Sequence, residues 1–409
     1  MTARLLASIS LALALTACAA ESTTARTDAQ TQPKTKSDCA RPGTWVVLDG
    51  LAPRAAAASS VLNAAAERDV VLLGEQHDAA DHHHWQLHTL AALHALRPNM
   101  VIGFEAFPRR VQPVLDRWVA GELDAATFLA DVQWEKVWGF SAQLYLPLLE
   151  FARIHRIPII ALNVELELNR AIGAKGWAAV PDARKEGVSR PAPASPAYRA
   201  ALFEVYRHHP VAKSADGEKP TPDSPAFQRF VESQTTWDRA MAEAIATRLS
   251  SAPADRRPLV VGIAGSGHLR QGFGIPHQLR DLGVARIATL LPVEVQDDCK
   301  ALGIGFADAV FTLSRARAVP PPRPRLGVRL EQKDKTVKIV GVMKDSLAAS
   351  MGVRAGDVIV SIAGTPVTSL ASVIAPIRAQ PPGTWLPIQL RRDTTTLDLV
   401  IKFPPAKPK

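Results

Sequence analysis

Two short motifs of the form Gly-x-x-His combine residue types that could do chemistry. They are GEQH at residues 74–77 and GSGH at residues 265–268, and each follows an apolar run. A glycine lets the backbone turn sharply where such a run ends. Glu105 adds a carboxylate at the end of a third apolar run. Two neutral imidazoles with one or two carboxylates suit a divalent metal ion, and the same groups could act as acid, base or ligand anchors. The candidate site residues are Glu75, His77, Glu105 and His268.

More histidines follow the first motif, in a segment with helical periodicity. His84 and His88 are four residues apart, so on a helix they share one face and could contact a ligand. We therefore include His84 in the candidate site. We expect His82 and His83 to be solvated at the start of this helix.

A second predicted helix, over residues 227–249, carries polar residues on its apolar stripe. Gln234 and Asp238 lie four residues apart on that stripe. Polar groups that face a core are costly unless they are paired. We expect them to meet a partner, such as an arginine or a bound ligand, or to belong to a buried hydrogen-bond network.

The elements that must position these residues are predicted by six apolar runs. The runs are continuous rather than alternating, which is typical of strands that are covered on both faces. Helix-length segments separate most of them, which predicts an α/β fold with a mainly parallel sheet flanked by helices. Ligands of such sheets bind beyond the carboxyl ends of the strands, where both motifs, Glu105 and Asn163 fall. The runs span residues 44–50, 69–75, 100–106, 157–163, 258–265 and 285–291.

The first 18 residues predict a bacterial lipoprotein signal peptide. Arg4 precedes an apolar run, 5–15, that is too short to span a bilayer. The sequence Leu-Thr-Ala-Cys then resembles a lipobox, with Cys18 as the lipidated residue. Ala19 after the cysteine favours the outer over the inner membrane, by resemblance to enteric sorting rules. Residues 19–42 have almost no large apolar side chains and predict a flexible tether on the periplasmic side.

Cysteine usage and charge add two expectations. With Cys18 lipidated, Cys39 and Cys299 remain, and in an oxidising compartment they are a candidate disulfide, with two free thiols as the alternative. The net charge of +9 favours anionic surfaces or ligands. The sequence contains no RNA- or DNA-binding motif, so we expect no nucleic-acid partner.

Composition divides the rest of the chain. The first domain is expected over residues 43–313. Within it, 174–225 is rich in Pro, Ala, Lys and Ser and predicts a mobile excursion with a short helix at 197–209. A Pro/Arg linker follows at 314–325.

Residues 326–405 resemble a bacterial PDZ domain of the type found in HtrA proteases. The resemblance rests on RLGVRL at 325–330 and on DSLAASMGVRAGDVIVSIAGTPVTSL at 345–370. It implies a small β-rich domain with two helices that binds an extended peptide by adding a strand to its sheet. The residues implied to hold the C-terminal carboxylate are Leu326, Gly327 and Val328. A structural appendage with a degenerate groove is the alternative.

Ordered motifs of the first domain resemble the ChaN family of haem-binding lipoproteins over about residues 45–292. The motifs are GEQHD, HHHWQ, GFEAF, IPIIALN, QTTWDRAMA and GIAGSGHLRQGFGIP. The family belongs to a superfamily with Tiki proteases and erythromycin-esterase-like enzymes, which share paired Gly-x-x-His motifs and an essential Glu. The resemblance implies haem binding for iron acquisition and a homodimer with stacked haems. It also implies a tyrosine ligand to the iron and a histidine at the propionates.

The chain has three tyrosines that could match this ligand. We prefer Tyr206, with His208 or His209 beside it, because haem iron accepts Tyr and His as axial ligands. Arg207 could pair with a propionate. Tyr145, in a predicted amphipathic helix, is the alternative ligand.

The sequence therefore predicts a lipid-anchored periplasmic haem-binding protein with a PDZ module for a peptide or protein partner. The alternative is a metal-dependent hydrolase that holds a divalent ion with the two motifs and Glu105. The chain has no Gly-x-Ser-x-Gly or HExxH motif, which argues against the proteases that use them. A binding protein is preferred over an enzyme.

Overall fold

The computed structural model describes residues 41–48, 50, 52–208, 220–294, 302–303, 305–314 and 325–405. They form two compact units, divided after residue 315. The signal peptide, nearly all of the tether and most of the linker lie outside the described residues. The predicted positions Cys18, Cys39, His209 and Cys299 also lie outside them.

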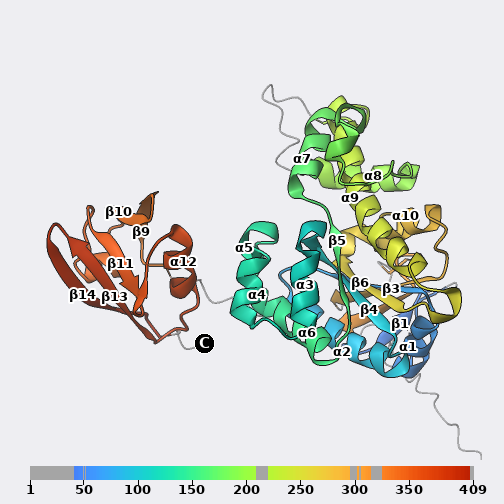
Figure 1. Ribbon diagram of the computed structural model, residues 1–409, viewed down its shortest axis with the longest axis horizontal. Coiled ribbons are helices and arrows are strands. Elements are labelled where there is room, and N and C mark those ends of the chain that lie inside the picture. Colours follow the sequence, from blue (N-terminus) through green and yellow to red (C-terminus); the bar gives the residue numbers. More distant parts are fainter. Residues whose placement is uncertain are drawn as a thin grey trace, which may run out of the picture. The chain divides into compact units, whose positions relative to one another are not determined.

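The first unit is built on an eight-stranded sheet with the order β2-β1-β8-β7-β3-β6-β4-β5 (Figure 1). The strands from β8 to β5 in this order run parallel, whereas β1 is antiparallel to both β2 and β8. The predicted mainly parallel sheet is confirmed, and each of the six apolar runs contains a strand. The strands are β1 (Trp45–Val47), β2 (Arg54–Ala56), β3 (Val70–Glu75), β4 (Met100–Pro108), β5 (Ile159–Asn163), β6 (Leu259–Gly265), β7 (Ile287–Glu294) and β8 (Ala309–Leu313).

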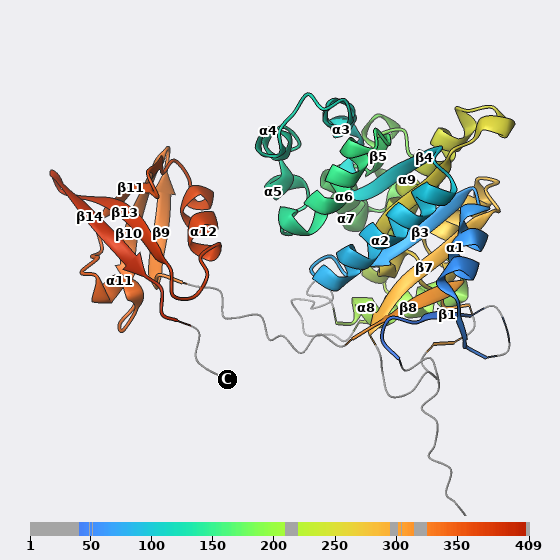
Figure 2. The same cartoon turned by 90° about the horizontal axis from the view of Figure 1, so that it is seen from below.

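Helices cover both faces of this sheet (Figures 1 and 2). In β3, Val71 and Leu73 pack in one core cluster with α1 to α6, whereas Val70 and Leu72 pack in another with α9 and α10. Because successive side chains point to opposite faces, burial of both faces requires the continuous apolar runs seen in the sequence. The helices are α1 (Ala58–Ala66), α2 (Ala80–Leu96), α3 (Gln112–Val119), α4 (Ala125–Asp131), α5 (Trp134–Val137), α6 (Ala142–Ile154), α7 (Leu166–Lys175), α8 (Pro196–Tyr206), α9 (Pro225–Ser250) and α10 (Ile275–Asp281).

The described part of segment 174–225 packs on α9. The short helix predicted there is present as α8, which begins where the Ser195 side chain accepts a hydrogen bond from Tyr198 N. Tyr198 and Leu202 of α8 pack with Phe227 of α9 in a small core cluster of their own.

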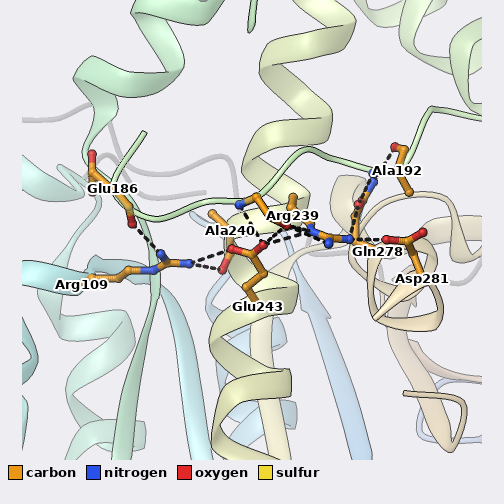
Figure 3. A network of polar contacts seen from close by, with 9 residues as sticks. Arg109, Glu186, Ala192, Arg239, Ala240, Glu243, Gln278 and Asp281 are labelled. Atoms are coloured by element: carbon orange, nitrogen blue, oxygen red, sulfur yellow. Dashed lines mark hydrogen bonds and ion pairs between the residues drawn. The ribbon is translucent and has the colours of Figure 1, made fainter. Parts of the chain in front are cut away.

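A network of polar contacts fastens residues 186–192 of this segment to the body of the domain (Figure 3). Arg109 donates hydrogen bonds of 2.9 Å to the carbonyl oxygens of Glu186 and Ala240. Gln278 of α10 exchanges two 2.9 Å hydrogen bonds with the backbone of Ala192.

The second unit is a six-stranded antiparallel sheet with two helices, as predicted. Its strand order is β14-β13-β11-β10-β9, and β12 pairs with β11. The residues implied for peptide binding directly precede or begin β9, where Gly327 O accepts a hydrogen bond of 2.8 Å from Met343 N. The elements are β9 (Val328–Lys333), β10 (Thr336–Val342), α11 (Leu347–Ser350), β11 (Val358–Ile362), β12 (Thr365–Pro366), α12 (Leu370–Arg378), β13 (Trp385–Arg392) and β14 (Thr395–Lys402). Within the described residues, no helix has the length and apolar character that a bilayer span requires.

Candidate functional site

The carboxyl ends of three adjacent strands meet at one edge of the first sheet. Glu75 ends β3 and is the register partner of Gly265, the last residue of β6. Glu105 of β4, on the other side of β6, accepts a 2.6 Å hydrogen bond from Gly265 N through Oε2. The structure therefore brings both Gly-x-x-His motifs and Glu105 together, as expected where parallel strands end.

Glu75 is the centre of a buried polar group on the β3 side. Its side chain is 1% exposed and accepts hydrogen bonds from His77 Nδ1 (2.8 Å), Tyr145 OH (2.5 Å) and Gln86 Nε2 (3.0 Å). His83 Nδ1 lies 3.4 Å from its second oxygen. Burial raises the pKa of Glu75, but the His77 hydrogen bond, the nearby His83 and the Tyr145 hydrogen bond together lower it below its usual value. The group therefore holds an ionised carboxylate.

His77 is fixed by this carboxylate. An ionised carboxylate only accepts hydrogen bonds, so Nδ1 carries the hydrogen and Nε2 carries the free lone pair of the neutral ring. The ring lies against Trp138 and Phe140, with centroids 4.7 and 5.0 Å away. Burial lowers the pKa of His77, but the hydrogen bond to Glu75 and the charges of Glu105 and Glu75 outweigh it and raise the pKa. Its side chain is 27% exposed.

A second group of the same kind lies on the β6 side. Asp238 of α9 is fully buried, accepts a hydrogen bond from His268 Nδ1 (2.6 Å) and another from Tyr198 OH (2.8 Å). His268 Nε2 lies 3.5 Å from Glu105 Oε1. Burial lowers the pKa of His268, but the charges of Glu105 and Asp238 raise it to about 9. We call His77 and His268 the rim histidines. The expectation of a buried network is met at Asp238, whereas Gln234 is only half-buried.

A cavity of about 450 Å³ opens beside His77, above the ends of β4 and β5. Aromatic rings of Trp138, Phe140 and Trp237 line it. The indole N–H groups of both tryptophans are buried and have no hydrogen-bond acceptor within the described residues.

Cations also line this cavity. Arg110 is paired with Glu165 at 2.5 Å. The side chains of Lys136 (α5) and Arg170 (α7) have no ion-pair or hydrogen-bond partner in the described part of the chain. The carboxylate of Glu167 also lines the cavity, so the lining combines an imidazole, aromatic surface and two unpaired cations with one further carboxylate. The excess of positive charge suits a flat apolar ligand with acidic groups.

The histidines of α2 are placed differently from the prediction. The expectation that His83 is solvated is wrong, since it is 2% exposed and lies behind Glu75. His82 is half-buried, and its Nδ1 accepts a hydrogen bond from Gln76 N. The helix begins at Ala80, which turns His83 and Gln86 inward on the stripe that continues with buried Leu90 and Leu93. That spacing of three and four residues was the sequence signal for His83 and Gln86.

His84 is not brought to the rim. Its side chain is 68% exposed, lies 3.9 Å from Asp81, and lines a separate groove of about 370 Å³ together with His88. Trp45, Trp85 and Phe311 also line that groove.

Tyr206 also lies apart from the rim histidines. It is 3% exposed, and its ring packs against Phe227 and Phe230 with centroids 5.3 and 5.2 Å away. His208 is exposed at the end of α8. The structure instead brings the other two tyrosines, Tyr145 and Tyr198, into the polar groups behind the rim histidines. No local sequence signal marked Tyr198, because its partner Asp238 lies 40 residues away.

The metal-dependent alternative gains no support from the geometry. Within the part of the chain that the structure describes, no group of three or more His, Cys, Asp or Glu side chains could hold a metal ion.

Comparisons with known proteins agree with the two-unit architecture. A family model described as haem-binding uptake, Tiki superfamily, ChaN matches residues 61–279, and a PDZ domain model matches residues 324–403. The structure described as cofacial heme binding to ChaN of Campylobacter jejuni is similar, with a TM-score of 0.51 and 19% identity. That similarity covers 65% of this chain and 96% of the other, and it shows the fold alone.

Two proteases are similar to a part of this chain. The HtrA-type protease AlgW with a decapeptide is 21% identical, and the serine endoprotease from Yersinia pestis is 25% identical. Each match has a TM-score of 0.19 and covers 21% of this chain and 30% of the protease. No curated protein sequence matches the chain.

Proposed function

Because the chain belongs to the ChaN family of haem-binding uptake proteins in the Tiki superfamily, we propose that its first unit binds haem in the cavity beside His77. The observation that carries the proposal is the lining of this cavity. Three aromatic rings line it, together with His77 and the unpaired cations Lys136 and Arg170.

The residues that line the cavity fit a haem group. Haem is a flat, largely apolar ring with two carboxylates, and sites for such ligands are concave and lined by aromatic side chains with a few placed polar groups. The rings of Trp138, Phe140 and Trp237 offer the apolar surface. Lys136 and Arg170 can pair with the carboxylates. Bound haem would supply an iron ion, and Trp138, Phe140, Trp237, Lys136 and Arg170 would hold and orient its ring and carboxylates.

We extend the proposal to the place and role of the protein. Lipidation at Cys18 anchors the chain on the periplasmic side, at the outer membrane, where it takes part in haem and iron acquisition. The lipobox-like sequence and the short apolar run before it support this placement. The same oxidising compartment supports a disulfide between Cys39 and Cys299.

Two kinds of partner belong to the proposal. The PDZ unit binds a peptide or protein partner through the backbone of residues 326–328, which is the way such domains hold a C-terminal carboxylate. A second copy of the chain is the other partner. The similar Campylobacter jejuni protein is described as binding heme cofacially, which supports a homodimer with stacked haems.

A haemin titration of the protein without residues 1–18 tests the binding proposal. We expect a saturable shift of the Soret band. Replacing both unpaired cations, in a Lys136→Gln, Arg170→Gln double variant, should weaken binding about tenfold, which corresponds to about 1.4 kcal/mol. Arg256→Gln serves as the matched control, because Arg256 is exposed and lies outside the cavity lining. Absence of a saturable shift in the unmodified protein would refute haem binding.

The anchor has a separate test. Cells fed a labelled fatty acid should incorporate label into the protein, and Cys18→Ser should abolish incorporation. Label that persists in the variant would show that the proposed lipidation site is wrong. Intact mass after alkylation, with and without prior reduction, decides the state of Cys39 and Cys299.

A further inference from the structure

The cavity offers few groups that haem iron accepts as an axial ligand. Such ligands are histidine, tyrosine, cysteine and methionine. Among the described residues that line the cavity, His77 is the one residue of these four types.

The three tyrosines are engaged elsewhere. Tyr145 donates its hydroxyl hydrogen to Glu75, and Tyr198 donates its own to Asp238. Burial and the charge of the accepting carboxylate raise the pKa of both phenols far above the usual value. Neither tyrosine lines the cavity, and each hydroxyl is occupied by its hydrogen bond to a buried carboxylate. Tyr206 is buried among phenylalanine rings.

His77, by contrast, is arranged as metal-binding histidines usually are. Such residues donate one ring N–H to a carboxylate, which fixes the ring and makes the other nitrogen a better ligand. Here Glu75 accepts from Nδ1 at 2.8 Å, and Tyr145 and Gln86 hold Glu75 in turn. Nε2 makes no hydrogen bond to the described residues and belongs to a side chain that lines the cavity.

Gly265 supplies the space for this imidazole. A Cβ atom at position 265 would lie 2.9 Å from His77 Cε1, closer than Cβ atoms approach, and a tight 3.2 Å from Nε2. Any side chain there would push the ring out of its place. Gly267, two residues on, has open space where its Cβ would be and offers a matched control.

We propose that His77 binds the haem iron through Nε2, in place of the tyrosine ligand that resemblance to the family implies. The inference rests on the proposed function, since it assumes that haem occupies this cavity. Within it, Glu75 and Tyr145 are positioning residues that act through His77.

The test is rescue by imidazole. His77→Gly leaves a hole that free imidazole can fill. We expect the variant to bind haemin at least about 10-fold more weakly than the unmodified protein, since loss even of the hydrogen-bond partner of a metal ligand costs about 10- to 100-fold. Its visible and electron paramagnetic resonance spectra should also change, and added imidazole should restore them. His155→Gly, at an exposed histidine, should keep the original spectra.

A second pair of variants guards against misfolding of His77→Gly. Gly265→Ala should lose the spectrum of histidine ligation, whereas Gly267→Ala should keep it, with circular dichroism as the check that both remain folded. Resonance Raman spectra of the unmodified protein should lack phenolate modes.

The outcomes separate the inference from the proposed function. Phenolate modes that vanish in Tyr145→Phe or Tyr206→Phe, with unchanged spectra in His77→Gly, would overturn the histidine ligand and leave haem binding standing. Absence of saturable haemin binding in the unmodified protein would overturn both.

Discussion

Tyr145 and Tyr198 occupy equivalent places in the site, because each donates its hydroxyl hydrogen to the carboxylate that fixes one rim histidine. The carboxylates are Glu75 and Asp238, and the hydrogen bonds measure 2.5 and 2.8 Å. Tyr145 and Asp238 come from helices that pack on opposite faces of the sheet, α6 and α9, and Glu105 lies 3.5 Å from His268. Each imidazole is thus oriented by a buried acceptor whose own position is fixed.

The pKa of His268 makes the stability of the first unit depend on pH. The pKa is about 9 in the folded protein against an ordinary value of 6.5, so the folded state keeps a proton that the unfolded chain releases between these values. The stability that this proton on His268 contributes is fully present below about pH 6.5 and is lost as the pH rises toward 9. Over this range the free energy of unfolding should decrease by up to about 3 kcal/mol.

Urea denaturation of the ligand-free protein across this pH window measures the effect. His268→Gln should be less stable at pH 6.5 and should lose most of the pH dependence. An equally steep decline in His268→Gln would assign the effect to another group.

Arg239 should be essential for attaching segment 186–192. Its nearly buried guanidinium donates to Asp281 at 2.5 Å, to Glu243 at 3.1 Å and to Ser189. Glu243 and Asp281 are partly exposed, so water screens part of the charge that is left when their arginine partner is removed. Arg239→Gln should therefore lower the free energy of unfolding by about 1.5–3 kcal/mol, the contribution of charged hydrogen bonds. Limited proteolysis should cut the variant within 186–192 at a lower protease concentration.

Arg256→Gln is the control for this experiment, because Arg256 is exposed and 3.8 Å from its neighbour Asp255. Its stability should change by no more than about 0.5 kcal/mol. Equal effects of the two substitutions would contradict the role of the network.

Asp357 should control the acid stability of the PDZ unit. Two hydrogen bonds from Arg392, of 2.8 and 2.9 Å, lower its pKa below 3.8, and the backbone N–H of Arg354 adds to this against the effect of burial. A lowered pKa stabilises the fold above the ordinary value, and this stability is lost as the pH falls below about 4.

Asp357→Asn should therefore destabilise the unit at pH 7 by about 1.5–3 kcal/mol, the contribution of charged hydrogen bonds. The stability of this variant should then decrease little further on acidification. Thermal unfolding of residues 316–409 at pH 7 and pH 3 provides the comparison, and an undiminished acid sensitivity of the variant would count against Asp357.

Gly327 should be irreplaceable in the loop before β9. Its φ is +76°, and a Cβ atom would lie 2.3 Å from Ser346 Cβ. Gly327→Ala adds a steric clash to the backbone strain and should cost about 2–4 kcal/mol. Gly364 has the same φ of +76° but open space, so Gly364→Ala should cost only about 1 kcal/mol of strain. Equal melting temperatures for the two variants would argue against the close contact.

The fold could be predicted because its determinants are local. Burial on both faces makes a strand such as β3 a continuous apolar run, and helix-length segments between such runs require a mainly parallel sheet. The antiparallel direction of β1 and the strands β2 and β8 could not be predicted. They are three to five residues long, and their pairing joins residue 45 to residue 311 across most of the domain.

The meeting of the two motifs at Glu105 also followed from sequence, since parallel strands place their carboxyl ends at one edge. The sequence by itself determined which strand ends carry ionisable residues. The spacing of His83, Gln86, Leu90 and Leu93 marks one face of α2, but only the tertiary structure decided that this face, and not the one with His84, turns to Glu75. It also decided that Tyr145 and Tyr198 complete the site. Their carboxylate partners lie 70 and 40 residues away, and such pairs are set by the packing of α6 and α8 rather than by any local pattern.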